Sequence, residues 1–199
     1  WEVLFHLKEY IADRLEPARL GTIEPGAYVA DDVWLGPGSY VEAGAMIKGP
    51  AIIGAGTVVR HGAYVREHCL IGRDCVVGHA TEIKHSVLLD NSQAPHFNYV
   101  GDSILGSGVN LGAGTRLANL KNDGSEIVVR VNGQSIATGL KKFGAILGDG
   151  VYTGCNVVTA PGTLVGPGSR VYPLALLRGV YPARTLIKVR TELEATPLD

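Results

Sequence analysis

Three basic residues recur at intervals of eighteen in the first half of the sequence: Lys48, Arg66 and Lys84. Each directly follows an aliphatic residue of a repeat in which residues eighteen apart are expected to stack. Like charges about 5 Å apart repel one another, and a bound anion would offset that repulsion. We therefore predict an anion site, most simply a phosphate bound by Arg66 and Lys84. The alternative is a solvated row of cations beside acidic neighbours.

A histidine that follows this column is a candidate general base. His96 is flanked by Pro95 and Phe97, close to Tyr99, in a stretch rich in polar residues. Imidazole titrates near neutral pH and can accept a proton from a reacting group. Glu82 could orient the ring of His96, as a carboxylate does in a catalytic triad. The alternative is an ordinary exposed loop histidine.

Metal ligation and phosphate-loop binding are less well supported. His61 and His79 are eighteen apart and should stack, but no third ligand stands at a matching position. We therefore predict no metal, although a zinc-dependent hydratase stays open as a distant alternative. The glycine-rich stretch 106–114 lacks a following helix pattern, so its glycines are read as corners of the repeat. Their backbone N–H groups could serve an oxyanion or a carbonyl.

The elements that must position these residues follow a period of six. A branched aliphatic residue occupies every sixth position from Ile23 to Leu89, usually followed four positions later by a small or β-branched residue. Neither an α-helix nor an alternating strand has this period. Hexapeptide repeats are typical of a β-solenoid, with three hexads to each triangular lap. The predicted fold is all-β: a single-stranded left-handed parallel β-helix.

Two interruptions and two flanking segments complete the predicted organisation. The hexad register breaks after Leu89, which predicts an extruded loop at 90–99, and a hairpin with an Asn132-Gly133 turn lies in an excursion at 118–146. Residues 1–22 form a capping helix and linker, with Leu4, Leu7, Ile11 and Leu15 on one stripe. The helix proper covers residues 1 to about 16 and covers the open end of the solenoid. The β-helix spans 23–172, and 173–199 form a C-terminal tail.

Composition excludes some classes of partner. The 199 residues carry a net charge of −1, which argues against nucleic acid or a membrane surface as partner. No apolar run is long enough to span a bilayer, and no secretory leader is visible. Three cysteines imply no disulfide framework, so we expect a cytoplasmic protein.

Several motifs resemble a known family of enzymes. The acetyltransferase domain of the bifunctional bacterial enzyme that makes UDP-N-acetylglucosamine is similar to three of them: Glu82-Ile-Lys84, Pro95-His96-Phe-Asn-Tyr99-Val-Gly-Asp102 and Gly108-Val-Asn110-Leu-Gly-Ala-Gly-Thr115. The related left-handed β-helix domains of sugar-1-phosphate nucleotidylyltransferases resemble the segment that runs from Ala118 through the hairpin to Gly150. The resemblance covers about residues 23–172.

The resemblance implies a role for individual residues. His96 would take a proton from a sugar amine as it attacks the thioester of acetyl-CoA, and the backbone N–H of Ala113 would face the oxyanion. The remaining implied contacts are Arg66, Lys84 and Tyr99 to the sugar phosphate, Asn110 and Asn119 to the sugar, Lys142 from the neighbouring subunit of a homotrimer, and Ala113 and Cys155 to CoA.

The predicted function is acetyl-CoA-dependent N-acetyl transfer to an amino-sugar 1-phosphate, with glucosamine 1-phosphate as the leading acceptor. An alternative stays open: a non-catalytic sugar-phosphate-binding or regulatory β-helix protein that works with a separate nucleotidylyltransferase. Pro173 favours that alternative, because it stands where a backbone N–H is expected to meet CoA and proline has none.

Overall fold

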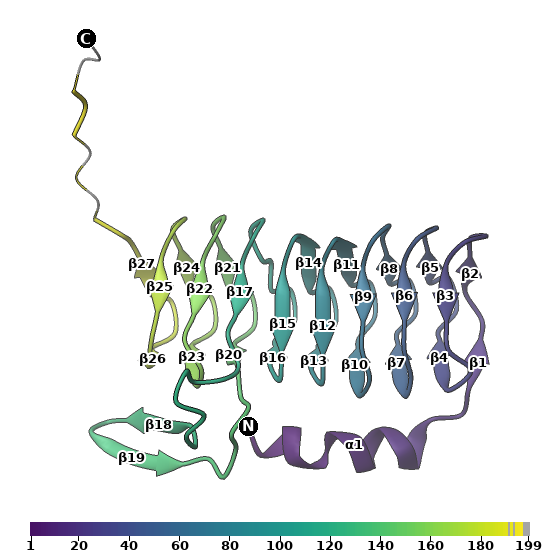
Figure 1. Cartoon of the computed structure of the whole chain (residues 1–199), viewed down its shortest axis with the longest axis horizontal. Coiled ribbons are helices and arrows are strands. Elements are labelled where there is room, and N and C mark those ends of the chain that lie inside the picture. The colour runs from purple at the N-terminus through teal and green to yellow at the C-terminus, as the bar shows by residue number, and fades with distance from the viewer. Residues whose placement is uncertain (191, 193, 197–199) are drawn as a thin grey trace.

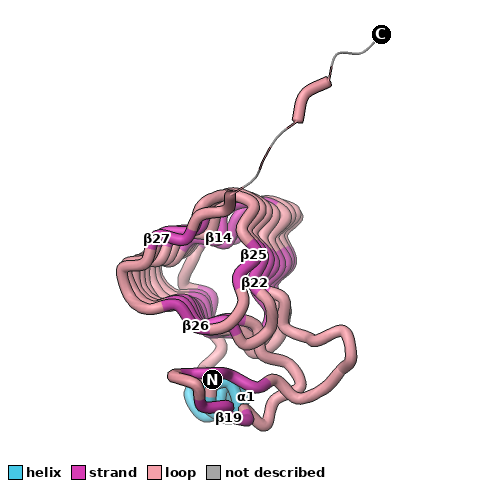
Figure 2. Tube along the Cα trace, turned by 90° about the vertical axis from the view of Figure 1, so that its left-hand side faces the viewer, coloured by secondary structure: helices cyan, strands magenta, loops and turns pink. Residues whose placement is uncertain are grey.

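The computed structural model describes residues 1–190, 192 and 194–196. It confirms the predicted left-handed parallel β-helix, in which the chain winds lap after lap along one long axis (Figure 1). Viewed along that axis, the laps superimpose into a three-walled tube (Figure 2). We call the three parallel sheets wall A, wall B and wall C, in the order in which a lap passes through them.

Short strands of successive laps make up each wall. Wall A contains β1 (Ala18–Arg19), β4 (Val33–Leu35), β7 (Ala51–Ile53), β10 (Cys69–Ile71), β13 (Val87–Leu88), β16 (Ile104–Leu105), β20 (Ala145–Leu147), β23 (Thr163–Val165) and β26 (Val180–Tyr181). Wall B contains β2 (Thr22–Ile23), β5 (Tyr40–Val41), β8 (Val58–Val59), β11 (Val76–His79) and β14 (Gln93–His96), followed by β21 (Tyr152–Thr153), β24 (Arg170–Val171) and β27 (Leu186–Ile187). Wall C contains β3 (Tyr28–Val29), β6 (Met46–Ile47), β9 (Tyr64–Val65), β12 (Glu82–Lys84), β15 (Tyr99–Gly101), β17 (Arg116–Leu117), β22 (Val158–Thr159) and β25 (Leu176–Leu177).

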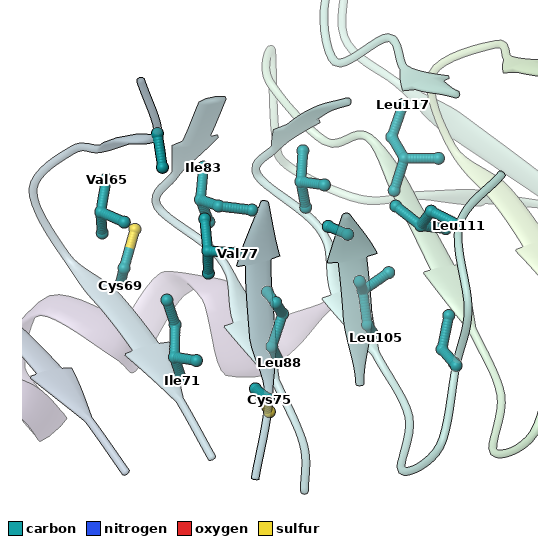
Figure 3. Packing of buried hydrophobic residues seen from close by; sticks show 14 of the residues in the cluster. Val65, Cys69, Ile71, Cys75, Val77, Ile83, Leu88, Leu105, Leu111 and Leu117 are labelled. Carbon is teal, nitrogen blue, oxygen red and sulfur yellow. The ribbon is translucent and has the colours of Figure 1, made fainter. Parts of the chain in front are cut away.

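Inward-facing aliphatic side chains fill the tube in columns. Along wall C, Val65 pairs with Ile83 and Ile83 with Val100, and all three are fully buried. The same columns of stacked side chains are visible from inside the tube (Figure 3). Each column buries apolar surface only if successive laps keep their register, because a one-residue slip turns a strand's side chains to the other face.

The register changes at one corner, where the hexad pattern breaks. Three residues join Arg66 to Leu70, but only two join Lys84 to Val87, so Leu70 pairs with Val87 seventeen residues on. As a result Leu88 faces inward and Leu89 is 43% exposed. The predicted extruded loop at 90–99 is therefore wrong: this segment contains β14 and forms part of an ordinary lap. The corner after Lys84 is one residue shorter than the corner before it. A strict hexad pattern takes no account of that missing residue and therefore predicted an insertion.

The predicted C-terminal tail is also wrong at its start. Strands β25, β26 and β27 pair with the preceding lap on walls C, A and B, so the β-helix continues through Ile187. The predicted tail residues 191, 193 and 197–199 lie outside the described part of the chain. The hexad signal faded here because outward-facing leucines such as Leu174 and Leu176 are exposed and blur the pattern.

The prediction that the N-terminal helix caps the open end of the β-helix is wrong for α1 (Glu2–Arg14). This helix lies along the outer face of wall A, parallel to the long axis (Figures 1 and 2). The outward column of wall A is aliphatic, unlike an exposed strand face, and α1 covers it with Leu4, Leu7 and Ile11. The covered part of that column consists of Ile52, Leu70, Val87, Ile104, Ile146 and Leu164, with Trp34 before it and Val180 after it. Within the described residues no helix has the length and apolar character needed to cross a membrane.

The predicted hairpin is present and packs beside α1. Its strands β18 (Val128–Val131) and β19 (Gln134–Ala137) are antiparallel, and both turn residues, Asn132 and Gly133, have positive φ. An Asn-Gly pair accepts that conformation readily, which is why it marks tight hairpins. Val129 joins Leu4, Leu7, Ile11 and Phe143 in a second core outside the tube. The excursion and α1 therefore stabilise each other against wall A.

This second core predicts the effect of substitutions in α1. Leu7 is 1% exposed, so Leu7→Ala should lower the free energy of unfolding by about 2–5 kcal/mol, through lost burial and the cavity left behind. Val3, on the same helix and 58% exposed, gives the matched control Val3→Ala, which should change stability little. Urea denaturation measures both; equal effects would contradict the packing of α1 on wall A.

Candidate functional site

The three basic residues form the predicted column. Lys48, Arg66 and Lys84 occupy the same position on successive laps, at the ends of the strands of wall C, since Val65 pairs with both Ile47 and Ile83. Arg66 and Lys84 are half-buried, on the edge where wall C turns toward wall A. The geometric part of the prediction therefore holds.

Each cation of this column has a carboxylate partner. The Nζ of Lys48 lies 3.9 Å from Glu67 Oε1, Arg66 Nη1 lies 2.9 Å from Glu82 Oε1, and Lys84 Nζ lies 3.2 Å from Asp102 Oδ2. The premise of unpaired, repelling charges is therefore wrong, and repulsion alone does not require an anion. Arg66 nevertheless retains unused donors: its buried Nε–H has no acceptor among the described residues.

A buried carboxylate joins three side chains of this edge. Asp102 is 4% exposed, and its Oδ1 accepts hydrogen bonds from His85 Nδ1 at 3.0 Å and from Lys84 Nζ at 3.4 Å. Its Oδ2 accepts from Lys84 Nζ and from the Nδ2 of Asn119. We call Arg66, Glu82, Lys84, Tyr99, Asp102 and Asn119 the polar cluster.

Tyr99 folds over a glycine to reach this cluster. A Cβ at Gly101 would lie 2.6 Å from Tyr99 Oη and 2.8 Å from Asn119 Nδ2, so both groups occupy the space that a side chain at 101 would take. Burial, together with the charges of Glu82 and Asp102, raises the pKa of Tyr99. The phenol is therefore a neutral donor at physiological pH.

His96 lies on a different edge of the tube, where wall B turns toward wall C. It ends β14, is exposed, and is the neighbour of His79 on the preceding lap. Only two residues separate it from Tyr99, so the two Cα atoms are at most roughly 11 Å apart. The predicted support from Glu82 is wrong: no hydrogen bond joins the two within the described structure, and the carboxylate of Glu82 is held by Arg66.

Three residues of this second edge stack in one column. Gly114 N donates to the carbonyl of His96, and Asn156 N donates to the carbonyl of Ala113, which aligns His96, Ala113 and Cys155 on successive laps. Leu174 N donates to the carbonyl of Cys155, so Pro173 comes next in the column. The N–H of Ala113 has no acceptor in the described part of the chain. It is therefore available to an oxyanion or a carbonyl of a ligand.

Asn110 does not join the polar cluster. It lies on the outer face of wall B, bridged to Gln93 and Tyr152 on the neighbouring laps. These residues line a shallow hollow of about 410 Å³ together with Asn91, Gly108 and Val109. Asn110 and Asn119 therefore occupy different walls of the tube, whose outer faces point in different directions (Figure 2).

Lys142 is exposed, in the segment that returns from the excursion. It lies opposite Leu120 in an antiparallel bridge, so it neighbours Asn119 of its own chain. No group of three or more histidine, cysteine, aspartate or glutamate side chains in the described residues could hold a metal ion.

Sequence reasoning missed Asp102 and His85. Asp102 was visible as the residue that ends the Tyr-x-Gly-Asp motif, and His85 as the residue after Lys84. The lost residue at this corner brings them together, because it places Asp102 directly beyond Lys84 and His85 on the next lap. No periodicity could have shown that contact.

The ionisation of Asp102 predicts a pH-dependent stability. Burial raises the pKa of Asp102, but hydrogen bonds from His85 and Asn119 and the charge of Lys84 lower it by more, so the net shift is downward. Such a carboxyl stabilises the fold above its unfolded pKa of about 3.9, and that contribution is lost as the pH falls through the folded pKa. The stability difference between wild type and Asp102→Asn, from urea denaturation, should stay constant above about pH 5 and shrink as the pH falls below it. A difference that also stays constant at the lower pH would contradict this.

Comparison with known proteins supports the predicted resemblance. The family model described as the GMPPB C-terminal domain matches residues 47–141. The bifunctional sugar-1-phosphate nucleotidylyltransferase/acetyltransferase of Sulfurisphaera tokodaii is 45% identical over 95 residues, which are 48% of this chain and 24% of that protein. The bifunctional protein GlmU of Methanococcus maripaludis is 36% identical over 114 residues, 57% of this chain and 28% of that protein.

Among solved structures, UDP-N-acetylglucosamine acyltransferase from Campylobacter jejuni superimposes with a TM-score of 0.55 and 18% identity, covering 80% of this chain and 68% of that one. This likeness shows the fold. The chain spans about a quarter of the length of the curated relatives it matches. The predicted resemblance is thus confirmed: the chain is a left-handed β-helix similar to part of the sugar-1-phosphate nucleotidylyltransferase/acetyltransferases.

Proposed function

We propose that this chain is an acyltransferase domain that moves an acetyl group from acetyl-CoA to the amine of an amino-sugar 1-phosphate, with glucosamine 1-phosphate as the leading acceptor. The observation that carries the proposal is the gathering of Arg66, Lys84, Tyr99 and Asn119 on one edge of wall C, from four different laps. Arg66 and Lys84 supply positive charge for a phosphate, while Tyr99 and Asn119 supply neutral hydrogen bonds for a sugar.

The proposed acetyl transfer uses residues of two edges of the tube: the polar cluster between walls C and A, and the His96 column between walls B and C. His96 accepts a proton from the sugar amine as its nitrogen attacks the thioester carbonyl, and the Ala113 N–H donates to the oxygen that becomes negative. The C–N bond forms, the C–S bond breaks, and the proton leaves with the CoA thiolate. Ala113 and Cys155, stacked on the same column, would contact CoA along the edge.

A second copy of the chain completes the proposed site. Asn110 on wall B and Asn119 on wall C cannot contact one ligand in a single copy, because they lie on different walls. In a homotrimer with parallel axes, wall B of one copy would face wall C of the next, with Lys142 beside the shared groove. Sedimentation equilibrium should then give three times the chain mass of 21.0 kDa. A monomer would contradict this arrangement.

The free thiols of Cys69, Cys75 and Cys155 favour a reducing compartment, so we propose a cytoplasmic location. Cell fractionation tests this location.

The second candidate function is a non-catalytic sugar-phosphate-binding or regulatory protein that works with a separate nucleotidylyltransferase. One observation favours it: Pro173 offers no N–H to CoA at the end of the His96 column. Calorimetric titration separates the two, because only the acyltransferase binds acetyl-CoA.

Removal of the general base gives the first functional prediction. His96→Ala should lower kcat about 10²–10⁴-fold in a thiol-release assay with glucosamine 1-phosphate and acetyl-CoA. His61, an exposed histidine on an earlier lap, supplies the matched control His61→Ala, with turnover near wild type. Unchanged turnover in His96→Ala would eliminate His96 as the base.

The proposed contact between Arg66 and the phosphate gives the second functional prediction. Arg66→Ala should weaken the binding of glucosamine 1-phosphate about 10- to 100-fold, the range for a lost hydrogen bond to a charged group, and should leave free glucosamine nearly unaffected. The KM values of the two acceptors measure this selectivity. If both acceptors weakened equally, Arg66 would not contact the phosphate.

A further inference from the structure

The side chain of Asp102 occupies the junction between the polar cluster and the excursion. It follows β15 at the corner between walls C and A, in a left-handed conformation with φ +46°. Its carbonyl accepts from Gly144 N at 2.8 Å, where the chain returns from the excursion, and its carboxylate accepts from Asn119, where the chain leaves. A single residue thus holds both ends of the excursion.

The carboxylate also determines which way its partners point. Asn119 donates through Nδ2 to Asp102, which leaves its Oδ1 as an acceptor for a ligand or for Tyr99. Lys84 Nζ is held by both carboxylate oxygens, at 3.4 and 3.2 Å, and its side chain is only 20% exposed. A lysine in water has a flexible stem, so this contact removes much of the freedom that ligand binding would otherwise have to remove.

An N–H donor in place of either carboxylate oxygen of Asp102 would break the hydrogen bonds that orient Lys84 and Asn119. Three donors converge on Asp102: the Lys84 ammonium, the His85 ring N–H and the Asn119 amide. A carboxylate offers only acceptor sites and can satisfy all three, whereas a carboxamide brings two N–H donors of its own. Because Asp102 is only 4% exposed, a donor that faces another donor there costs more than it would in water.

We infer that Asp102 is a positioning residue, which presents Lys84 and Asn119 to the sugar-phosphate acceptor without contacting it. The inference rests on the proposed function and adds to it a residue that the resemblance does not assign. Its consequence is selective: loss of the carboxylate should weaken the acceptor far more than acetyl-CoA, which is expected on the other edge, beside Ala113 and Cys155.

The first test is Asp102→Asn, with Asp90→Asn as its matched control. Asp90 is also a carboxylate held by a basic residue of the preceding lap, Arg73, but it lies at another corner. Asp102→Asn should raise the KM for glucosamine 1-phosphate about tenfold or more, the equivalent of about 1.4 kcal/mol. The KM for acetyl-CoA should stay within about twofold. Asp90→Asn should leave both KM values near wild type.

A comparison with a double variant separates positioning from general destabilisation. If Asp102 acts through Lys84 and Asn119, Asp102→Asn should add little to the increase in the acceptor KM already caused by the double variant Lys84→Ala/Asn119→Ala. Full additivity, or a rise in both KM values, would overturn the inference. If wild type neither binds nor acetylates glucosamine 1-phosphate, the proposed function fails first, so the two failures are distinguishable.

A second variant keeps the inference testable if Asp102→Asn does not fold. Asn119→Asp is nearly isosteric and places a carboxylate against Asp102, where the two charges repel until one takes a proton. The other titratable groups around the pair are Lys84, His85 and Tyr99, with Arg66 and Glu82 beyond. The ratio of the acceptor KM of Asn119→Asp to that of wild type should therefore fall from about pH 8 to about pH 6. A ratio independent of pH would overturn the inference.

Discussion

The register between successive laps is the constraint on which the rest of this structure depends. Every wall is a ladder of parallel hydrogen bonds, and the inward columns stay mostly apolar only while that ladder stays aligned. A lap can gain or lose a residue only at a corner, where no ladder partner is lost. The corner between Lys84 and Val87 shows this: one residue fewer than on the preceding lap, yet Ile83 and Leu88 both remain fully buried.

The same constraint assembles the polar cluster. Neighbouring laps lie about one strand spacing apart, roughly 4.8 Å, so opposite charges in adjacent columns of neighbouring laps meet without any dedicated loop. Arg66 reaches Glu82 and Lys84 reaches Asp102 in this way. The cations are consequently neutralised within the chain before any ligand arrives. A bound phosphate would compete with these ion pairs or share their cations. The direction in which each pair holds its cation would therefore affect how the phosphate binds.

The outer face of wall A contributes to stability through the apolar surface that α1 and the hairpin bury. Its outward column is aliphatic, which would be an exposed hydrophobic strip on a tube of this length, and α1 with the hairpin buries it. Phe143 anchors the return of the excursion in the same apolar layer, and its N–H donates to the carbonyl of Asn119. The packing that closes the second core thus also fixes the backbone of a predicted ligand-binding residue.

The sequence by itself determined the β-helix, the stacking of Lys48, Arg66 and Lys84, and the Asn132-Gly133 hairpin, because each depends on local periodicity or local turn chemistry. The tertiary structure alone decided that 90–99 belongs to a regular lap, that α1 lies along wall A, and that Glu82 pairs with Arg66 and not with His96. It also decided that Asp102 collects Lys84, His85 and Asn119, and that Asn110 lies on another wall. The path of 90–99 and the contacts of Asp102 depend on how many residues one corner holds, whereas α1 lies along wall A because of the aliphatic outward column. A corner has no period, so only the folded chain shows which side chains its length brings together.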